Sequence, residues 1–361
     1  MKRETKIIDQ GIVCRIQRRL FSYFGWPSVA RADDGALLMV CSGLRIAHVD
    51  PFGKVVMYKS FDEGRTWGGP HIVLDTPLDD RDAGIVNMGG GQVVVTSFNN
   101  SRQAQHYWTE KGMNGSPAAS ALCRAYLDTI TDEEEQRFLG AHVIKSCDNG
   151  HTWGEPRKVP ICAPHGPTLR RNGTLIFAGM RFDDTTPTGG HPISIYTSND
   201  GLAYRHLRDV PASDDPRVAG LVHCEPHILE LANGRLVLHI RIEKLFSICQ
   251  SVSDDGGKTF SVPKLLGNEG SPPHLVQHSS GAVICTYGRR VPPFGIFAMI
   301  SRDNGDTWST EQDVWFAGGS RDIGYPCTVE LPGGDLFTVF YDVIPGDRGI
   351  ASILWFRWRL V

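Results

Sequence analysis

Four stretches of the chain repeat one short pattern: S-F-D-E-G-R-T-W from Ser60, S-C-D-N-G-H-T-W from Ser146, S-D-D-G-G-K-T-F from Ser253 and S-R-D-N-G-D-T-W from Ser301. The shared pattern Ser-x-Asp-x-Gly-x-Thr-Trp/Phe is typical of a tight turn, because short polar side chains bond their own backbone and glycine accepts a positive φ. A weaker fifth copy has Ser198, Asp200 and Tyr204 at the matching positions. Internal repeats of this kind predict an array of small sheets rather than one continuous sheet.

A second repeat runs between these boxes, and it consists of two extended segments joined by a glycine turn. Examples are P-S-V-A-R-A-D-D-G-A-L-L-M-V from Pro27 and P-H-I-L-E-L-A-N-G-R-L-V-L-H from Pro226, and similar segments begin at Gly84, Pro167, Pro273 and Pro326. With the strands that flank each box, every repeat predicts a four-stranded antiparallel sheet. Six such blades predict an all-β fold, a six-bladed β-propeller in a single domain over residues 1–361, closed by the N-terminal strand I-I-D-Q-G-I-V-C-R-I from Ile7.

Residues 101–140 interrupt the repeat within the second blade. The segment A-A-S-A-L-C-R-A-Y-L-D-T-I from Ala118 predicts a helix, and a capping box of Thr131 and Glu134 predicts a second, shorter one. The acidic run from Asp132 to Glu135 is expected to be a solvated helix start. An insertion of this length is a candidate lid, or a contact between copies in a homo-oligomer.

Composition and charge exclude several classes of protein. The 361 residues carry a formal net charge of −3, with 41% hydrophobic and 21% charged residues, so no basic excess indicates nucleic-acid binding. No segment approaches the roughly 18 apolar residues of a membrane span, and the start M-K-R-E-T-K-I-I-D-Q lacks the apolar core of a signal peptide. Nine cysteines without a C-x-x-C pair favour reduced thiols. We therefore expect a cytoplasmic protein without a membrane partner.

Blade geometry separates the boxes from the expected site. The third strand of a blade ends opposite the end at which the first strand begins, so the box aspartates Asp62, Asp148, Asp255 and Asp303 are expected to be structural. Polar residues recur where a first strand begins and a second strand ends: His165 with Arg181, Glu225 with Arg241, His274 with Arg290, and Tyr325 with Asp342. These pairs predict a polar pocket at one end of the propeller axis.

At these residues the chain resembles the sialidase (neuraminidase) superfamily, specifically bacterial-type sialidases with Asp-box, or BNR, repeats. The segment V-H-C-E-P-H-I-L-E-L-A-N-G-R-L-V-L-H-I-R from Val222 is similar to the family segment with the glutamate partner of the nucleophile and a substrate-binding arginine. The segment D-I-G-Y-P-C-T-V-E-L-P-G-G-D-L-F-T-V-F-Y-D resembles the one that carries the tyrosine nucleophile. The resemblance implies the nucleophile Tyr325, its base Glu225, the carboxylate ligand Arg241, and a further arginine at Arg289 or Arg290.

The chemistry of an acidic sugar gives these residue types a reason. A sialic acid has a carboxylate on its anomeric carbon that repels an anionic nucleophile, so a neutral tyrosine suits the attack, and arginines bind the carboxylate in a bidentate manner. The family's general acid lies just before the first box, where this chain reads A-H-V-D-P-F-G-K. The resemblance implies Asp50 in that role, with His48 as the alternative because imidazole transfers protons near neutral pH.

One family motif is absent from the first blade. Sialidases usually have Phe/Tyr-Arg-Ile-Pro there, with an arginine that joins the carboxylate clamp, whereas this chain reads F-G-W-P from Phe24. Candidates to replace that arginine are Arg45 and Arg81, and Trp26 is a candidate platform for a sugar ring. The other candidate binding residues are Asp82, beside Arg81, and the pair His165 and Arg181.

The sequence thus predicts a retaining exo-glycosidase that releases a terminal acidic sugar from a carbohydrate substrate. Two alternatives keep the fold: a glycosidase or lyase for polysaccharide containing uronic acid or rhamnose, with His48, His165 or Tyr325 as acid and base, and a non-catalytic carbohydrate-binding propeller. No recurring ligand spacing predicts a metal site, and no nucleotide fingerprint predicts a cofactor.

Overall fold

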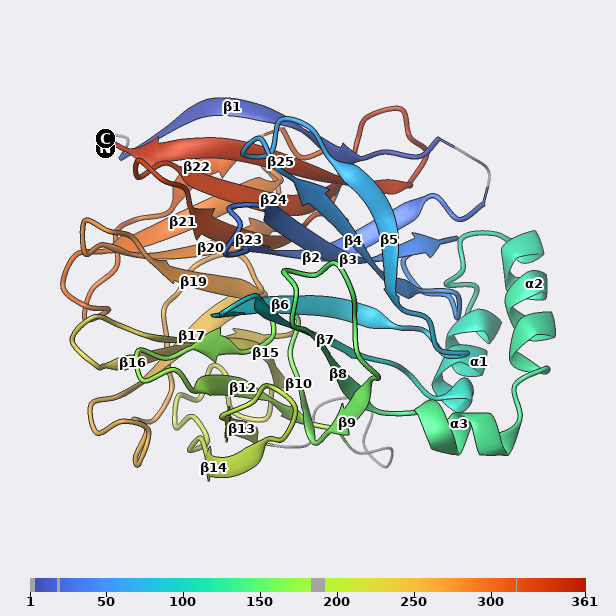
Figure 1. The fold of residues 1–361 in the computed structure, drawn as a ribbon, viewed down its shortest axis with the longest axis horizontal. Helices are drawn as coiled ribbons and strands as arrows, with labels where there is room; N and C mark the ends of the chain where they lie inside the picture. The colour runs from blue at the N-terminus through green and yellow to red at the C-terminus, as the bar shows by residue number, and fades with distance from the viewer. Residues whose placement is uncertain (1–3, 18–19, 183–191, 316) are drawn as a thin grey trace.

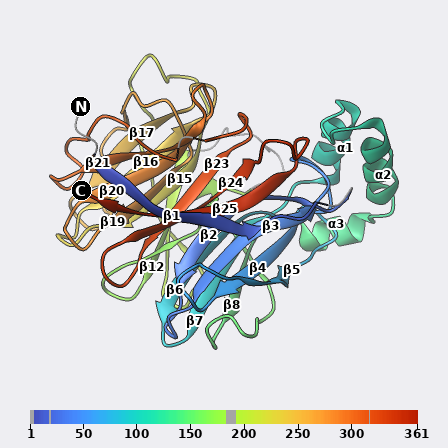
Figure 2. The same ribbon diagram turned by 90° about the horizontal axis from the view of Figure 1, so that it is seen from above.

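Six antiparallel sheets form a ring in the computed structural model, which describes residues 4–17, 20–182, 192–315 and 317–361 (Figures 1 and 2). Blade one consists of β2 (Tyr23–Arg31), β3 (Leu37–Arg45), β4 (Lys54–Ser60) and β5 (Gly68–Leu74), and blade two of β6 (Arg81–Gly89), β7 (Gln92–Phe98), β8 (Ala141–Ser146) and β9 (Arg157–Val159). Blade three consists of β10 (Ile161–Cys162), β11 (Thr168–Leu169), β12 (Leu175–Arg181), β13 (Ile193–Ser198) and β14 (Arg205–Asp209). Its inner strand is broken, because β10 and β11 both pair with β12.

The other three blades each have four strands. Blade four consists of β15 (His223–Glu230), β16 (Leu236–Ile242), β17 (Ser247–Ser253) and β18 (Lys264–Leu265), and blade five of β19 (Pro273–Gln277), β20 (Val283–Arg289), β21 (Gly295–Ser301) and β22 (Gln312–Trp315). Blade six consists of β23 (Gly324–Glu330), β24 (Leu336–Val343), β25 (Ala351–Leu360) and β1 (Thr5–Cys14). The six-bladed propeller predicted from the repeats is confirmed.

The N-terminal strand closes the ring as the sequence predicted. Strand β1 is antiparallel to β25, with Thr5 opposite Leu360. The pairing continues to the end of the chain, where the Val361 N–H donates to the Glu4 carbonyl at 2.9 Å. The start of β1 and the end of β25 therefore lie side by side (Figure 1), and the outer edge of β25 is covered rather than exposed.

The boxes are turns at the ends of third strands, opposite the starts of the inner strands. In the first box, the Asp62 carboxylate accepts from the Thr66 N–H at 2.8 Å and from its hydroxyl at 2.7 Å. These hydrogen bonds from Thr66 lower the pKa of Asp62 to about 2. Asp148, Asp255 and Asp303 make the same contacts with Thr152, Thr259 and Thr307. The prediction that the box aspartates are structural is therefore correct.

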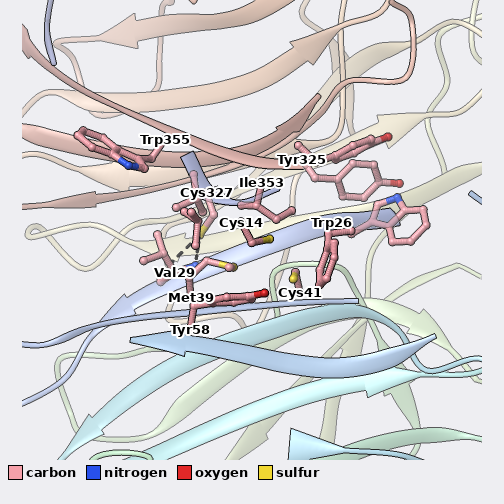
Figure 3. Packing of buried hydrophobic residues seen from close by; sticks show 14 of the residues in the cluster. Cys14, Trp26, Val29, Met39, Cys41, Tyr58, Tyr325, Cys327, Ile353 and Trp355 are labelled. Atoms are coloured by element: carbon pink, nitrogen blue, oxygen red, sulfur yellow. Dashed lines mark hydrogen bonds between the residues drawn. The ribbon is translucent and has the colours of Figure 1, made fainter. Parts of the chain in front are cut away.

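The box aromatic residue packs between blades. The ring of Trp67, in the blade-one box, lies 6.2 Å from that of Phe337 in blade six. Gly64 has φ of +90°, and a Cβ there would lie 2.3 Å from the Phe337 ring, so this position requires glycine. The same blade boundary holds a buried cluster in which the Val29 N–H contacts the Cys327 sulfur at 3.3 Å. Figure 3 shows Trp26 and Tyr325 at one end of that cluster and Trp355 at the other.

The insertion in blade two forms three helices, α1 (Arg102–Glu110), α2 (Pro117–Leu127) and α3 (Asp132–Phe138), grouped on one side of the ring (Figures 1 and 2). Helices α2 and α3 confirm the two predicted ones, and the capping box of Thr131 and Glu134 is present. Helix α1 was not predicted, although its N-cap Ser101 accepts from the Ala104 N–H and is the expected residue type for a helix start. None of the helices in the described ranges has the length and apolar character needed to cross a membrane.

Candidate active site

A bulge repeated in four inner strands positions the central side chains of the site. Trp26, Asp82, Glu225 and Tyr325 all have positive φ, between 45° and 55°. Each lies where the pairing of an inner strand with its neighbour shifts register. Such φ values cost free energy in residues other than glycine and are concentrated at functional sites, and bulges redirect side chains. Different blades thereby direct these residues toward one end of the propeller.

The centre of the site is a hydrogen-bonded group of Tyr325, Glu225 and Arg241. The Tyr325 hydroxyl donates to one Glu225 oxygen at 2.7 Å, and Arg241 donates to the other at 2.5 Å. Arg241 also lies 3.2 Å from the Tyr325 oxygen. Burial, and secondarily the Glu225 charge, raises the pKa of Tyr325 well above 10. The phenol therefore keeps its proton, and Glu225 is placed to accept it.

A second arginine, Arg290, lies against Tyr325. Its guanidinium carbon is 5.5 Å from the centroid of the Tyr325 ring, and it donates to the Ile323 carbonyl and the Tyr341 hydroxyl, each at 2.9 Å. It has no carboxylate partner among the described residues, so it is suited to bind an anionic substrate group. Arg289, the alternative from sequence, instead pairs with Glu269 and Glu311.

The structure corrects the roles expected for Trp26 and Arg45. Trp26 is only 2% exposed, and the Arg81 guanidinium carbon lies 4.2 Å from the centroid of its ring, so its ring is not an open platform for a sugar. Arg45 is fully buried and pairs with Asp79 and Asp50, so it is not free to bind a substrate carboxylate. Arg81, whose side chain is 12% exposed and which shares Asp79, is the arginine nearer the surface.

The position of Asp50 does not fit its expected role as general acid either. Its carboxylate is fully buried and accepts from the backbone N–H groups of Ile46, Ala47 and Phe52, at 2.8 to 3.0 Å. These bonds hold the loop in shape, and none of its surface reaches solvent. The structure therefore does not support Asp50 as a general acid.

His48, two residues earlier, is half-buried and paired. Its side chain is 41% exposed, and its Nδ1 lies 3.0 Å from an oxygen of Asp322. The Tyr23 hydroxyl donates to the other oxygen of Asp322 at 2.8 Å, and the Tyr341 hydroxyl contacts the first at 3.1 Å. Burial lowers the pKa of His48 below 6.5 despite the opposing effect of Asp322. The pair is arranged as an imidazole oriented by a carboxylate.

Asp322 is a candidate site residue that the sequence did not predict. It lies in the loop before β23 of blade six, three residues before Tyr325, and is 274 positions from His48. The only signal was its closeness to the proposed nucleophile in the D-I-G-Y-P segment. Burial raises its pKa, but the hydrogen bond and charge of His48, the Tyr23 hydroxyl and the Arg290 charge together outweigh that effect, and the pKa lies below its ordinary value.

Asp82 lies beside the centre of the site. It is 5% exposed, and one carboxylate oxygen is buried without a hydrogen-bond partner among the described residues. Burial first, and then the nearby Glu225 charge, raises the pKa of Asp82 to about 7. The group therefore gains its proton as the pH falls through neutrality, which reduces repulsion of an anionic ligand in mildly acidic solution.

The pair of His165 and Arg181 does not converge on the site. Arg181 binds Asp209 and Ser194 on blade three, and its side chain is 42% exposed. His165 is buried behind Tyr325, with ring centroids 6.4 Å apart. It packs with His227 and His274 at 5.9 and 5.0 Å. Burial lowers the pKa of each of the three histidines well below 6.5.

These three neutral histidines predict sensitivity to acid. The unfolded chain binds protons as the pH falls through 6.5, while the folded state does not, so the free energy of unfolding should fall below that pH. The loss should reach at most about 1.4 kcal/mol per pH unit for each histidine. Urea denaturation between pH 7.5 and 5.5 measures the slope, which His274→Gln should reduce and the exposed His71→Gln should not. An equal slope in His274→Gln and wild type would contradict the assignment.

Within the described part of the chain, no three His, Cys, Asp or Glu side chains are arranged to hold a metal ion. The central group of Tyr325, Glu225 and Arg241, together with its neighbours Arg290 and Asp82, comprises a phenol, two carboxylates and two guanidinium groups. These groups have the chemistry required for proton transfer, nucleophilic attack and anion binding.

Comparison with known families agrees with this fold. The chain belongs to the family of BNR repeat-like domains, whose model matches residues 129–339, more than half of its length. No curated protein matches the chain by sequence. Many solved structures are similar to it, and the expected resemblance to the sialidase superfamily is confirmed at the level of the fold.

Three of the similar structures illustrate the range of proteins with this fold. A protein of unknown function from Dyadobacter fermentans has a TM-score of 0.79 at 21% identity, covering 99% of this chain and 100% of that one. The NanB sialidase of Streptococcus pneumoniae has a TM-score of 0.67 at 13% identity, covering 97% and 71%. The α-L-arabinanase of Penicillium chrysogenum has a TM-score of 0.60 at 15% identity, covering 97% and 98%. At these identities the likeness concerns the fold alone.

Proposed function

We propose that the protein is a retaining exo-glycoside hydrolase that releases a terminal acidic sugar, sialic acid or a related sugar, with Tyr325 as nucleophile. The observation that carries the proposal is the 2.7 Å hydrogen bond from Tyr325 to Glu225, flanked by two guanidinium groups. A buried phenol beside a carboxylate base is an activated but uncharged nucleophile. It suits a substrate whose own carboxylate repels an anion.

Each of these residues has a separate role in the two steps of the reaction. Glu225 takes the proton while the Tyr325 oxygen bonds to the anomeric carbon, and the glycosidic bond breaks as His48 protonates the leaving oxygen. In the second step His48 takes a proton from water, which attacks the anomeric carbon, and Tyr325 leaves and regains its proton from Glu225. Arg241 and Arg290 bind the substrate carboxylate.

A second candidate is a glycosidase or lyase for polysaccharide containing uronic acid. It is favoured by Gly25, which stands where sialidases usually have the arginine of their opening motif and which precedes Trp26 in the bulge of blade one. Arg81 lies over that indole instead. A guanidinium contributed by blade two rather than blade one would place the bound carboxylate differently.

The test is a release screen with aryl glycosides of sialic acid, related acidic sugars and uronic acids, with neutral glycosides as controls. We expect an acidic sugar to be released. NMR should show that the sugar, when it is first released, has the same anomeric configuration as the substrate. Because His48 donates only when protonated and its pKa lies below 6.5, activity should peak on the acid side of neutrality. An inverted product contradicts the nucleophile, an unsaturated ultraviolet-absorbing product identifies a lyase, and binding without release identifies a non-catalytic propeller.

A further inference from the structure

The helical insertion contacts the loop that carries His48, residues 46–53, which we name the His48 loop. The Asn114 side-chain amide donates to the Val49 carbonyl at 2.8 Å, immediately after His48 in sequence. The ring of Tyr126 packs on that of Phe52 with centroids 4.8 Å apart. The insertion thus contacts the loop through α2 and through the segment between α1 and α2.

A third contact reaches the loop through a buried carboxylate. Gln105 of α1 is 1% exposed and donates to Asp79 at 2.8 Å. Asp79 is fully buried and also binds Arg45 and Arg81. The same two arginines donate to the His48 carbonyl, at 3.4 and 3.2 Å. A continuous path of hydrogen bonds therefore joins α1 to the backbone of His48.

The charges along this path make each of its hydrogen bonds costly to lose. Burial alone would raise the pKa of Asp79, but Arg45 and Arg81 outweigh it, and the pKa lies below its ordinary value. The carboxylate therefore stays charged and requires its full set of donors, because a buried charge that loses a hydrogen bond is costly. Gln105 supplies one of these donors from the helical insertion rather than from the sheets of blades one and two.

We propose that the insertion over residues 101–140 is the positioning element for His48, and that Gln105 and Asn114 are its positioning residues. The catalytic meaning of this inference rests on the proposed function, in which His48 transfers the proton of the leaving group. Proton transfer requires heavy atoms within about 2.6 to 3.2 Å. A displacement of about 1 Å at such a group reduces the rate by roughly 100-fold.

The test replaces Gln105 by methionine, which keeps the length of the side chain and removes the donor. The matched control is Gln136→Met, at an exposed position of α3. In Gln105→Met we expect kcat to fall about 10- to 100-fold with KM within about twofold. The pKa of His48, measured by NMR and assigned with His48→Gln, should rise toward 6.5 as the loop loosens and its ring gains water.

The pKa of His48 depends on the position of the His48 loop, because charged groups face the imidazole. Asp322 raises it, while Arg81 and Arg290 lower it, so a shifted loop changes all three interactions at once. This measurement does not depend on activity: if wild type cleaves no glycan, the proposed function fails, yet the pKa still tests the positioning. A Gln105→Met variant that matches Gln136→Met in both kcat and His48 pKa overturns the inference. If Gln105→Met does not fold, Asn114→Leu, which leaves Asp79 untouched, decides between the same two results.

Discussion

Replacing Tyr325 by phenylalanine should lower kcat for release of an acidic sugar by at least about 1,000-fold. The substitution removes only the oxygen that forms the covalent bond, so the nucleophilic route is lost while the ring remains to pack against Trp26 and Arg290. Positioning and arginine binding remain, and KM should therefore change much less than kcat. Initial rates with the best aryl glycoside from the screen measure both constants.

The control for this variant is Tyr107→Phe, which removes the same oxygen from a tyrosine that is 57% exposed on α1. It should keep the wild-type kcat. Thermal melting of Tyr325→Phe should stay close to wild type, because the lost hydrogen bond leaves the Glu225 charge paired with Arg241. A Tyr325→Phe enzyme that retains more than about a tenth of wild-type kcat is incompatible with a tyrosine nucleophile.

Replacing Arg45 by methionine should destabilise the protein by about 3 to 5 kcal/mol. Arg45 is fully buried, and its loss removes the principal counter-charge of Asp79 and a partner of Asp50. An unpaired buried carboxylate is far more costly than a missing surface ion pair. Urea denaturation at pH 7 measures the loss, and Arg181→Met, at a pair whose side chains are about 40% exposed, should lose less than about 1 kcal/mol.

The pH dependence of this loss identifies its cause. Without Arg45, burial is expected to raise the folded pKa of Asp79 above its unfolded value of 3.8. The folded variant then binds more protons than its unfolded chain, so its deficit relative to wild type should shrink as the pH falls from 7 toward 4. A deficit that does not vary with pH would mean that lost packing, rather than the unpaired charge, explains the instability.

Much of the fold was predictable from the repeats because each repeat is a local unit. Four boxes and six strand pairs determine six sheets, since each turn and its strands lie close together in sequence. Strand direction then separates Asp62 and its counterparts from the inner-strand residues at the other end of the propeller. Helix α1 escaped prediction because only its cap, Ser101, provided a clear local signal.

The central group was predictable for the same reason. Glu225 and Arg241 lie at the ends of adjacent strands of one blade, and the start of an inner strand brings Tyr325 to the same face. Motifs read within single blades therefore identified all three residues. Their contacts across the ring, such as the bond from Tyr325 to Glu225, follow once the propeller closes.

The sequence by itself thus determined the propeller, the structural boxes and the inner-strand residues Glu225, Arg241 and Tyr325, because each depends on local turns and strand direction. Only the tertiary structure decided that Arg290 rather than Arg289 contacts Tyr325, that Arg45 and Asp50 are buried, and that His48 pairs with Asp322. These outcomes depend on which side chain fills the space between blades and which remains in water. Burial, and pairing between residues that are hundreds of positions apart in sequence, arise only when the ring closes. A local pattern of residues therefore does not predict them.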